Sequence, residues 1–216
     1  MILENVITQL LWGMVTSIEI FLLTLLFSLP LGLVVAAGRM SSFKPLRWLM
    51  KLYISIMRGT PLMLQLIVVF FGPYYLFGMS LSPDYRFIAV IIAFTINYAA
   101  YFAEIYRGGI EAIPKGQYEA AQVLGYSKIE TFFIIILPQV FKIILPSVTN
   151  EVITLVKDTS LSFVIAIPEM FTVAKQIAAA DASIAALLVA GVFYYVFNIL
   201  VAFFMEHLEN RLSYYE

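Results

Sequence analysis

Five long apolar segments constrain the fold of this chain more than any other feature. They cover about residues 16–37, 61–78, 87–106, 131–156 and 185–205. A helix needs about 20 mostly apolar residues to cross the hydrocarbon core of a bilayer. Hydrophobic residues make up 62% of the chain and charged residues 12%, whereas a soluble domain has about 45–50% apolar and about 25% charged residues. The sequence therefore predicts an all-α integral membrane protein, with five transmembrane helices in one domain covering residues 1–216.

The charge and the residue types exclude several functional classes. The net charge of −1 argues against nucleic-acid binding, which needs a basic surface. The sequence contains no cysteine and one histidine, and it shows neither a metal-ligand cluster nor a nucleophile with a base. A phosphate-binding loop of the pattern G-x-x-x-x-G-K-S/T does not occur either. We therefore predict that the chain is not an enzyme and binds no metal or cofactor itself.

Lysine and arginine residues set the expected orientation in the membrane. They gather in the connection after the first apolar segment (Arg39, Lys44, Arg47 and Lys51) and in the connection after the third (Arg107, Lys115 and Lys128). Because cytoplasmic connections carry the excess of basic residues, we expect the N-terminus outside and the C-terminus in the cytoplasm.

Two shorter regions complete the expected architecture. The first dozen residues alternate between apolar and polar types, which favours a separate interfacial helix along the bilayer surface. Residues 160–183 contain apolar stretches interrupted by Pro168, Glu169, Lys175 and Asp181, so they are too polar for a sixth span. We expect short helices there, near the outer mouth, that act as a gate.

The longest polar interruption, residues 111–138, is predicted to contain a short cytoplasmic helix at about residues 116–127. Its composition favours a helix, and Gly125 suits either the helix C-cap or a close approach of the backbone to another surface. Ala120, Ala121 and Leu124 would form a small apolar face that can dock into a groove on a partner.

This region also carries a recognisable spacing. Glu119-Ala120-Ala121 is followed by three residues and Gly125, and then by nine residues and I-x-L-P at 135–138. The pattern resembles the signature of the membrane subunits of bacterial ABC importers. R-G-T-P at 58–61, E-I-Y-R-G-G-I at 104–110 and K-D-T-S-L at 157–161 are similar to permeases for polar amino acids of the histidine, glutamine and arginine type.

The resemblance implies a type I importer fold in the bacterial plasma (inner) membrane. Two such subunits, either identical or close paralogues, would form the pore, and an extracytoplasmic binding protein would deliver the amino acid. Two cytoplasmic ATPase subunits would hold ATP and magnesium, and each would receive one coupling helix. Alternating access would follow from their closure. The residues expected to couple to the ATPase are Gly116, Gln117, Glu119, Ala120, Ala121, Leu124 and Gly125.

Polar residues within the apolar segments are candidates for the substrate path or gate, because they are costly inside a membrane. Helical periodicity places Asn97, Tyr101 and Glu104 on one face, and Glu151, Thr154 and Asp158 on another. Lys157, Thr159 and Ser160 complete the set. Three alternatives stay open: an interhelical hydrogen bond for Asn97, a local ion pair between Glu104 and Arg107, and a packing role for residues 157–160.

The same residues suggest a substrate. Asp158 or Glu104 could bind an ammonium group, and a helix terminus with Thr159 and Ser160 could bind a carboxylate. The excess of acidic groups weakly favours a basic amino acid such as arginine, histidine or lysine. The alternative is a self-sufficient channel or secondary transporter for small polar solutes, but five spans are few for that role and the cytoplasmic helix would have no function.

Overall fold

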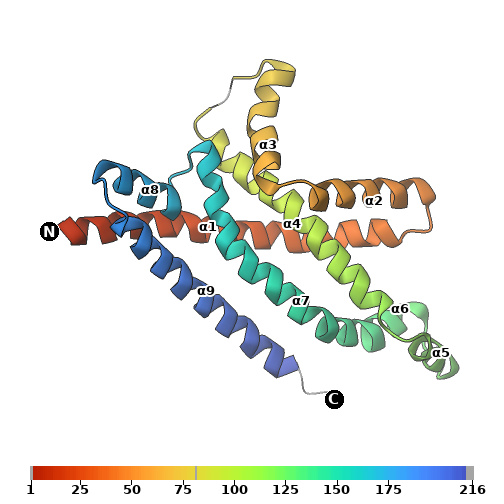
Figure 1. Ribbon diagram of the computed structural model, residues 1–216. Coiled ribbons are helices and arrows are strands. Elements are labelled where there is room, and N and C mark those ends of the chain that lie inside the picture. The colour runs from red at the N-terminus through yellow and green to blue at the C-terminus, as the bar shows by residue number, and fades with distance from the viewer. Residues whose placement is uncertain (1, 81, 213–216) are drawn as a thin grey trace.

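The computed structural model describes residues 2–80 and 82–212, and within these ranges every regular element is a helix (Figure 1). The elements are α1 (Ile2–Met40), α2 (Lys44–Gly59), α3 (Leu62–Phe77), α4 (Tyr85–Glu111), α5 (Lys115–Val123), α6 (Lys128–Glu130), the π-helix η1 (Thr131–Ile136), α7 (Leu137–Asp158), the 3₁₀ helix η2 (Thr159–Ile165), α8 (Met170–Ala180) and α9 (Ala185–Leu212). The predicted all-α class is confirmed.

Four segments within the described residues are long and apolar enough to cross a membrane: Glu4–Met40, Tyr85–Glu111, Lys128–Ile165 and Ala185–Arg211. They contain four of the five predicted spans. The span predicted at residues 61–78 corresponds to α3, whose 16 residues extend only about 24 Å, less than the ~30 Å hydrocarbon core. α3 is one half of a bent pair with α2, which meets it at an angle of 110°. Five spans are reached when this pair is counted as one.

The break between α2 and α3 is caused by the local sequence and is stabilised by side-chain hydrogen bonds. Pro61 disfavours helical geometry in the residue before it, and Thr60 is extended at φ −124° and ψ 148°. The side-chain amide of Gln65 donates to the carbonyl oxygens of Met57 (2.9 Å) and Thr60 (3.1 Å). Asn97 of α4 donates to the same Met57 oxygen at 3.1 Å. Carbonyl groups released by the break are therefore bound by side chains.

The prediction of a separate interfacial helix in the first dozen residues is wrong. Residues 2–12 are the first part of α1, which has 39 residues and a length of about 58 Å. Leu10 and Met14 are buried in a cluster with Met170 and Ala174 of α8. The N-terminal segment is thus held by packing against α8 rather than lying alone.

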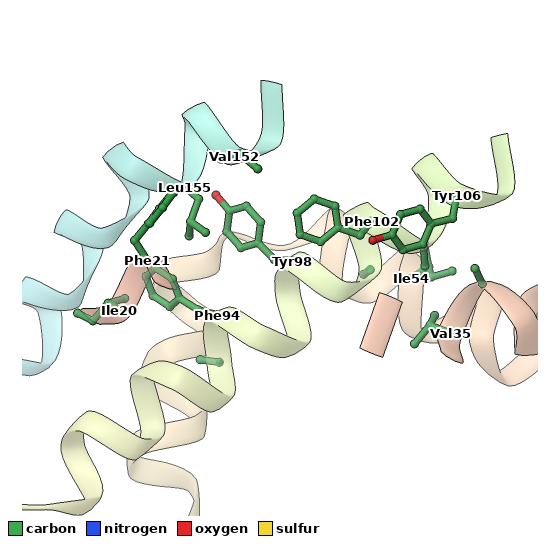
Figure 2. Close-up of a cluster of buried hydrophobic side chains, with 14 of the residues drawn as sticks. Ile20, Phe21, Val35, Ile54, Phe94, Tyr98, Phe102, Tyr106, Val152 and Leu155 are labelled. Carbon is green, nitrogen blue, oxygen red and sulfur yellow. The ribbon is translucent and has the colours of Figure 1, made fainter. Parts of the chain in front are cut away.

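The core is centred on α4, which packs against α1, α2, α3 and α7. Figure 2 shows Phe94, Tyr98 and Phe102 of α4 pointing toward residues of neighbouring helices, and all three are buried. In Figure 1, α5 and α6 lie where α4 ends and α7 begins, whereas α8 lies beside the start of α9. We refer to these opposite ends of the bundle as the α5 end and the α8 end.

The crossing of α4 and α7 depends on Gly109. A Cβ atom at this position would lie 2.1 Å from Cγ2 of Ile144 and 3.3 Å from Cγ1 of Val140. We expect Gly109→Ala to lower the stability by about 1–3 kcal/mol, because overpacking forces a shift of the neighbouring helix. The thermal midpoint of the purified protein would measure this.

The neighbouring Gly108 provides the control, since a Cβ there meets nothing within 4 Å. Gly108→Ala should be neutral or slightly stabilising, because alanine is the better helix former. Combining Gly109→Ala with Ile144→Ala should cost less than the sum of the two single changes. Equal stability of the Gly108 and Gly109 variants would contradict this account of the crossing.

Candidate functional site

The α5 region is shaped by a glycine turn and a capping box. α5 ends at Val123, and Gly125 adopts φ +85°, a conformation that favours glycine. The N–H of Tyr126 donates to the carbonyl of Ala121 and that of Gly125 to Gln122, both at 3.1 Å, which is a Schellman motif. Of the two roles predicted for Gly125, the structure contains the capping one: Gly125 is the left-handed residue directly after the C-cap residue Leu124.

The helix predicted at residues 116–127 is therefore shorter than expected at its C-terminal end. Ser127 belongs to the next element, where it caps α6: the N–H of Glu130 donates to Ser127 Oγ at 3.3 Å and the N–H of Ser127 donates to Glu130 Oε2 at 2.8 Å. This reciprocal capping box fixes where the chain turns into the long helix that follows. The turn between α5 and α7 is thus ordered by its own sequence.

The surface of α5 differs from the predicted docking face at one position. Gly116, Gln117, Glu119, Ala120 and Leu124 are exposed, as a docking surface requires. Ala121, however, is only 1% exposed, because α5 packs against η1 on that side. The most exposed large apolar side chains of this region are Val123, Leu124 and Ile129, at 87%, 74% and 72%.

Asn97 does not line a path, which corrects its assignment to the substrate path. It is buried, and its amide donates to Gln65 Oε1 at 3.0 Å and to the Met57 carbonyl at 3.1 Å. The interhelical hydrogen bond, the alternative considered for this residue, is what the structure contains. Periodicity placed Asn97 on the same face as Tyr101, but the α2–α3 break lies opposite it.

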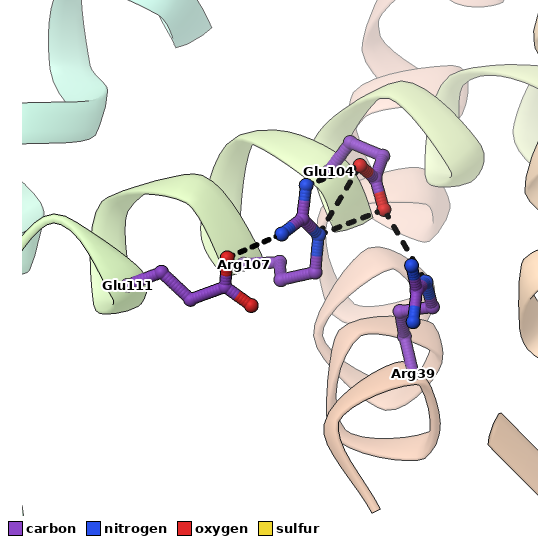
Figure 3. Close-up of polar contacts among 4 residues, drawn as sticks. All are labelled: Arg39, Glu104, Arg107 and Glu111. Carbon is purple, nitrogen blue, oxygen red and sulfur yellow. Dashed lines mark hydrogen bonds and ion pairs between the residues drawn. The ribbon is translucent and has the colours of Figure 1, made fainter.

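Glu104 is held in an ion-pair network at the α5 end of α4 (Figure 3). Arg107 Nη2 lies 2.7 Å from Glu104 Oε2, and Arg39 Nε of α1 lies 3.8 Å from Glu104 Oε1. Arg107 also pairs with Glu111. The local pair considered for Glu104 is therefore present and extends to α1. With two cations beside it, this carboxylate is satisfied within the chain and is not free to bind an ammonium group.

Four other side chains form what we call the polar cluster: Arg58, Tyr101, Glu151 and Asp158. The Arg58 guanidinium carbon lies 5.2 Å from the centre of the Tyr101 ring, a cation–π contact. Glu151 is close enough to Arg58 to be attracted by its charge, and close enough to Asp158 to be repelled by a second carboxylate. Asp158 Oδ2 accepts a hydrogen bond of 2.8 Å from the Tyr98 hydroxyl. The structure thus brings the predicted faces of α4 and α7 together at Tyr101, Glu151 and Asp158.

The remaining candidates on α7 and η2 divide into two groups. Thr154 and Lys157 are exposed beside the polar cluster. Thr159 is fully buried, and its hydroxyl donates to the Val156 carbonyl at 2.8 Å, so its assignment as a carboxylate ligand is wrong. The Ser160 hydroxyl donates to the Lys157 carbonyl at 2.7 Å. These hydroxyls satisfy carbonyl groups where α7 tightens into η2.

Comparison with known proteins decides which family has this arrangement. A family model described as "binding-protein-dependent transport system inner membrane component" matches residues 28–214. The chain belongs to this family. It is an inner-membrane permease component, so it is not itself catalytic and ATP hydrolysis belongs to a separate subunit.

Two curated permeases of Bacillus subtilis (strain 168) illustrate the similarity. The L-cystine transport system permease protein TcyB is 37% identical over 205 residues, covering 94% of this chain and 86% of that protein. The arginine transport system permease protein ArtQ is 37% identical over 202 residues, covering 93% and 91%. A solved structure described as the crystal structure of an amino acid ABC transporter with histidines has a TM-score of 0.88 at 30% identity, over 97% of this chain and 96% of that one.

Two residues at the polar cluster, Tyr98 and Arg58, were not assigned to the substrate path from the sequence alone. Tyr98 is an ordinary aromatic in an apolar segment by sequence, yet its hydroxyl binds Asp158. Because Arg58 precedes the span predicted at residues 61–78, the sequence alone indicates a position near the cytoplasmic side, as scaffold or inner gate. Arg58 instead lies against Tyr101, near the middle of α4, because α2 runs into the fold before the chain bends. The sequence signal that could have identified Tyr98 is its position three residues before Tyr101, which places the two side chains on the same side of the helix.

Proposed function

We propose that this permease is the pore-forming subunit of an ATP-driven importer that moves a polar amino acid, preferentially a basic one, into the cytoplasm. The polar cluster carries this proposal. Glu104 is already paired with Arg39 and Arg107, so Glu151 and Asp158 are the acidic groups left beside the exposed polar face of α7. Permeases for arginine, cystine and glutamate/aspartate among its relatives support an amino-acid substrate.

In this proposal, α7 presents Glu151, Thr154, Lys157 and Asp158 to a pore formed with a second permease subunit. A carboxylate beside an aromatic ring suits a cationic side chain, because both attract positive charge. Lys157 is exposed beside them and could bind the α-carboxylate of the amino acid. Arg58, stacked on Tyr101, keeps the cluster from holding a cation too tightly.

The same proposal assigns α5 to the cytoplasm and to coupling. The N-terminus would then lie outside, where a binding protein delivers the substrate, and η2 and α8 would form the gate on that side. Two ATPase subunits carrying ATP and magnesium would each receive one α5. Gly116, Gln117, Glu119, Ala120, Leu124 and Gly125 are the coupling residues, and Val123 adds to their exposed apolar surface.

Exchanging Asp158 for asparagine tests the substrate preference. We expect Asp158→Asn to lower arginine uptake about tenfold, which corresponds to ~1.4 kcal/mol, while glutamine uptake changes little. Asparagine keeps the shape and still accepts the Tyr98 hydroxyl, so packing is preserved. Uptake of labelled arginine, glutamine, glutamate and cystine would be measured in vesicles holding the permease, its ATPase and its binding protein.

Asn150→Ala, an exposed change on α7, is the matched control and should leave the ratio of arginine to glutamine uptake unchanged. Unchanged uptake and selectivity in Asp158→Asn would remove the polar cluster from the substrate path. Uptake by vesicles containing the permease without any ATPase would instead support a self-sufficient transporter and contradict the proposed function.

A further inference from the structure

α2 has three distinct faces around its axis. One face packs on α1 and α4 through Met50, Tyr53, Ile54 and Met57, and the Tyr53 hydroxyl donates to the Ile96 carbonyl of α4. This face is fully accounted for by the fold. The other two faces have no partner in the described part of the chain.

The second face is basic. Lys44, Arg47 and Lys51 follow one another at spacings of three and four residues, which aligns them along the helix. All three are exposed, and none of them forms an ion pair within residues 2–80 and 82–212. The sequence of α2 contains no aspartate or glutamate. The N-terminal half of this helix is therefore a row of uncompensated positive charge.

The third face is apolar and equally exposed. Trp48 is 64% exposed, Leu49 51%, Leu52 41% and Ile56 46%. A contiguous apolar surface of this kind marks a contact with membrane or protein. Only three residues separate the start of α2 from the end of α1 at Met40. The basic row therefore begins where a spanning helix leaves the bilayer.

Trp48 lies between the basic row and the apolar face. Tryptophan is enriched at the boundary between headgroups and hydrocarbon, because its ring is apolar and its N–H is a donor. Long basic side chains next to such a residue can bury their methylene groups and extend their charges toward headgroups. Charge and apolar surface are thus arranged for one kind of partner, a lipid surface that carries negative charge.

We propose that the N-terminal half of α2 is a binding site for the headgroups of anionic phospholipids. Lys44, Arg47 and Lys51 bind the phosphate groups, while Trp48 and Leu52 enter the adjacent acyl region. Basic clusters directly beside a transmembrane helix attract anionic lipids in this way. The proposal rests on the orientation given under the proposed function only in placing the site in the cytoplasmic leaflet.

The chain offers a clean probe, because its two tryptophans are Trp12 and Trp48. In Trp12→Phe, fluorescence reports Trp48 alone. The full chain would be reconstituted in vesicles containing equal fractions of brominated phosphatidylglycerol or brominated phosphatidylcholine. We expect quenching to indicate a three- to tenfold enrichment of the anionic lipid around Trp48, roughly the effect of one paired cation. The excess should fall as salt is added.

Two variants test whether the basic side chains of α2 cause the enrichment of the anionic lipid. Lys44→Gln, Arg47→Gln and Lys51→Gln together, in the Trp12→Phe background, should abolish the excess quenching by the anionic lipid. Trp48→Phe leaves Trp12, which is 72% exposed in a stretch that has no lysine or arginine before Arg39. Trp12 should be quenched equally by both lipids.

Three results would overturn the proposal: equal quenching of Trp48 by the two lipids, an excess that survives the triple change, or weak quenching by both lipids, which would mean that protein covers α2. The measurement needs neither substrate nor ATP. Its outcome is therefore independent of whether the permease imports a basic amino acid.

Discussion

Replacing Gly125 with leucine is expected to abolish ATP-driven uptake while leaving the permease in the membrane. Gly125 has φ +85°, where a residue with a side chain costs about 1–2 kcal/mol. A Cβ atom there meets nothing within 4 Å, so the first carbon of the leucine side chain has room within the chain. The open space around this turn is where the proposed ATPase partner approaches. The loss should therefore appear in coupling rather than in folding.

Co-purification of the ATPase and its stimulation by the loaded binding protein would measure the coupling. Gly125→Asn is the conservative variant, because asparagine tolerates left-handed geometry, and it should retain part of the uptake. Gly191→Leu on α9 is the steric control: its Cβ also meets nothing within 4 Å, and it lies far from α5 in the chain. Normal stimulation of the ATPase in Gly125→Leu would count against docking at this turn.

The sequence predicted the spanning helices well because hydropathy depends on composition rather than on packing. The exception is instructive. Residues 44–59 were interpreted as a charged connection, yet their apolar and basic residues repeat with helical spacing and form α2. The span predicted at residues 61–78 matches α3, but α3 is only one half of a bent pair, since the path turns by 110° at Thr60 and Pro61. The side chains of Gln65 and Asn97 that brace this bend come from later in the chain, which no local pattern reveals.

The candidate site was predicted in part for a related reason. Helical periodicity identifies residues that share a face, such as Tyr101 with Glu104, but it does not say which residues lie opposite. Arg39 of α1 lies opposite Glu104, and Arg58 of α2 lies opposite Tyr101. Both arginines come from helices packed against α4. Only the packing of these helices therefore shows that Glu104 forms an ion pair and is not a free residue of the path.

Glu169 shows the same limit most clearly. In the sequence it interrupts an apolar stretch, which suggested polarity near the outer mouth. In the structure it is fully buried and caps the N-terminus of α8. Its Oε2 accepts from Phe171 N (2.7 Å) and the Tyr194 hydroxyl (2.9 Å). Its Oε1 accepts from the N–H (2.7 Å) and hydroxyl (2.8 Å) of Thr172.

Replacing Glu169 with leucine is the change with the largest expected effect on stability. Four donors lose their acceptor in a buried site, and each unsatisfied group costs about 1–3 kcal/mol. Partial relaxation should leave a loss of about 3–5 kcal/mol, comparable to breaking a buried pair. For a chain of this size, the thermal midpoint should fall by roughly 10 °C. Thermal unfolding of the purified permease would measure it.

A graded series separates the hydrogen bonds from general packing. Tyr194→Phe removes one donor and leaves the carboxylate with three, so it should lower the stability by only about 1 kcal/mol. Glu169→Gln keeps one acceptor oxygen and should fall between the two. If Glu169→Leu were as stable as the unchanged chain, the four hydrogen bonds would not be what holds α8 in place.

The position of Glu169 also predicts a functional consequence beyond stability. α1 approaches this site so closely that a Cβ at Gly13 would lie 2.7 Å from the Met170 Cα atom, and Ser17 of α1 accepts from the Met170 N–H at 3.3 Å. Tyr194 comes from α9. One carboxylate and its neighbours therefore join α8 to both helices that flank it. If α8 forms the outer gate, Glu169→Gln should lower uptake more than its loss of stability explains, and uptake in proportion to the folded fraction would contradict a role in gating.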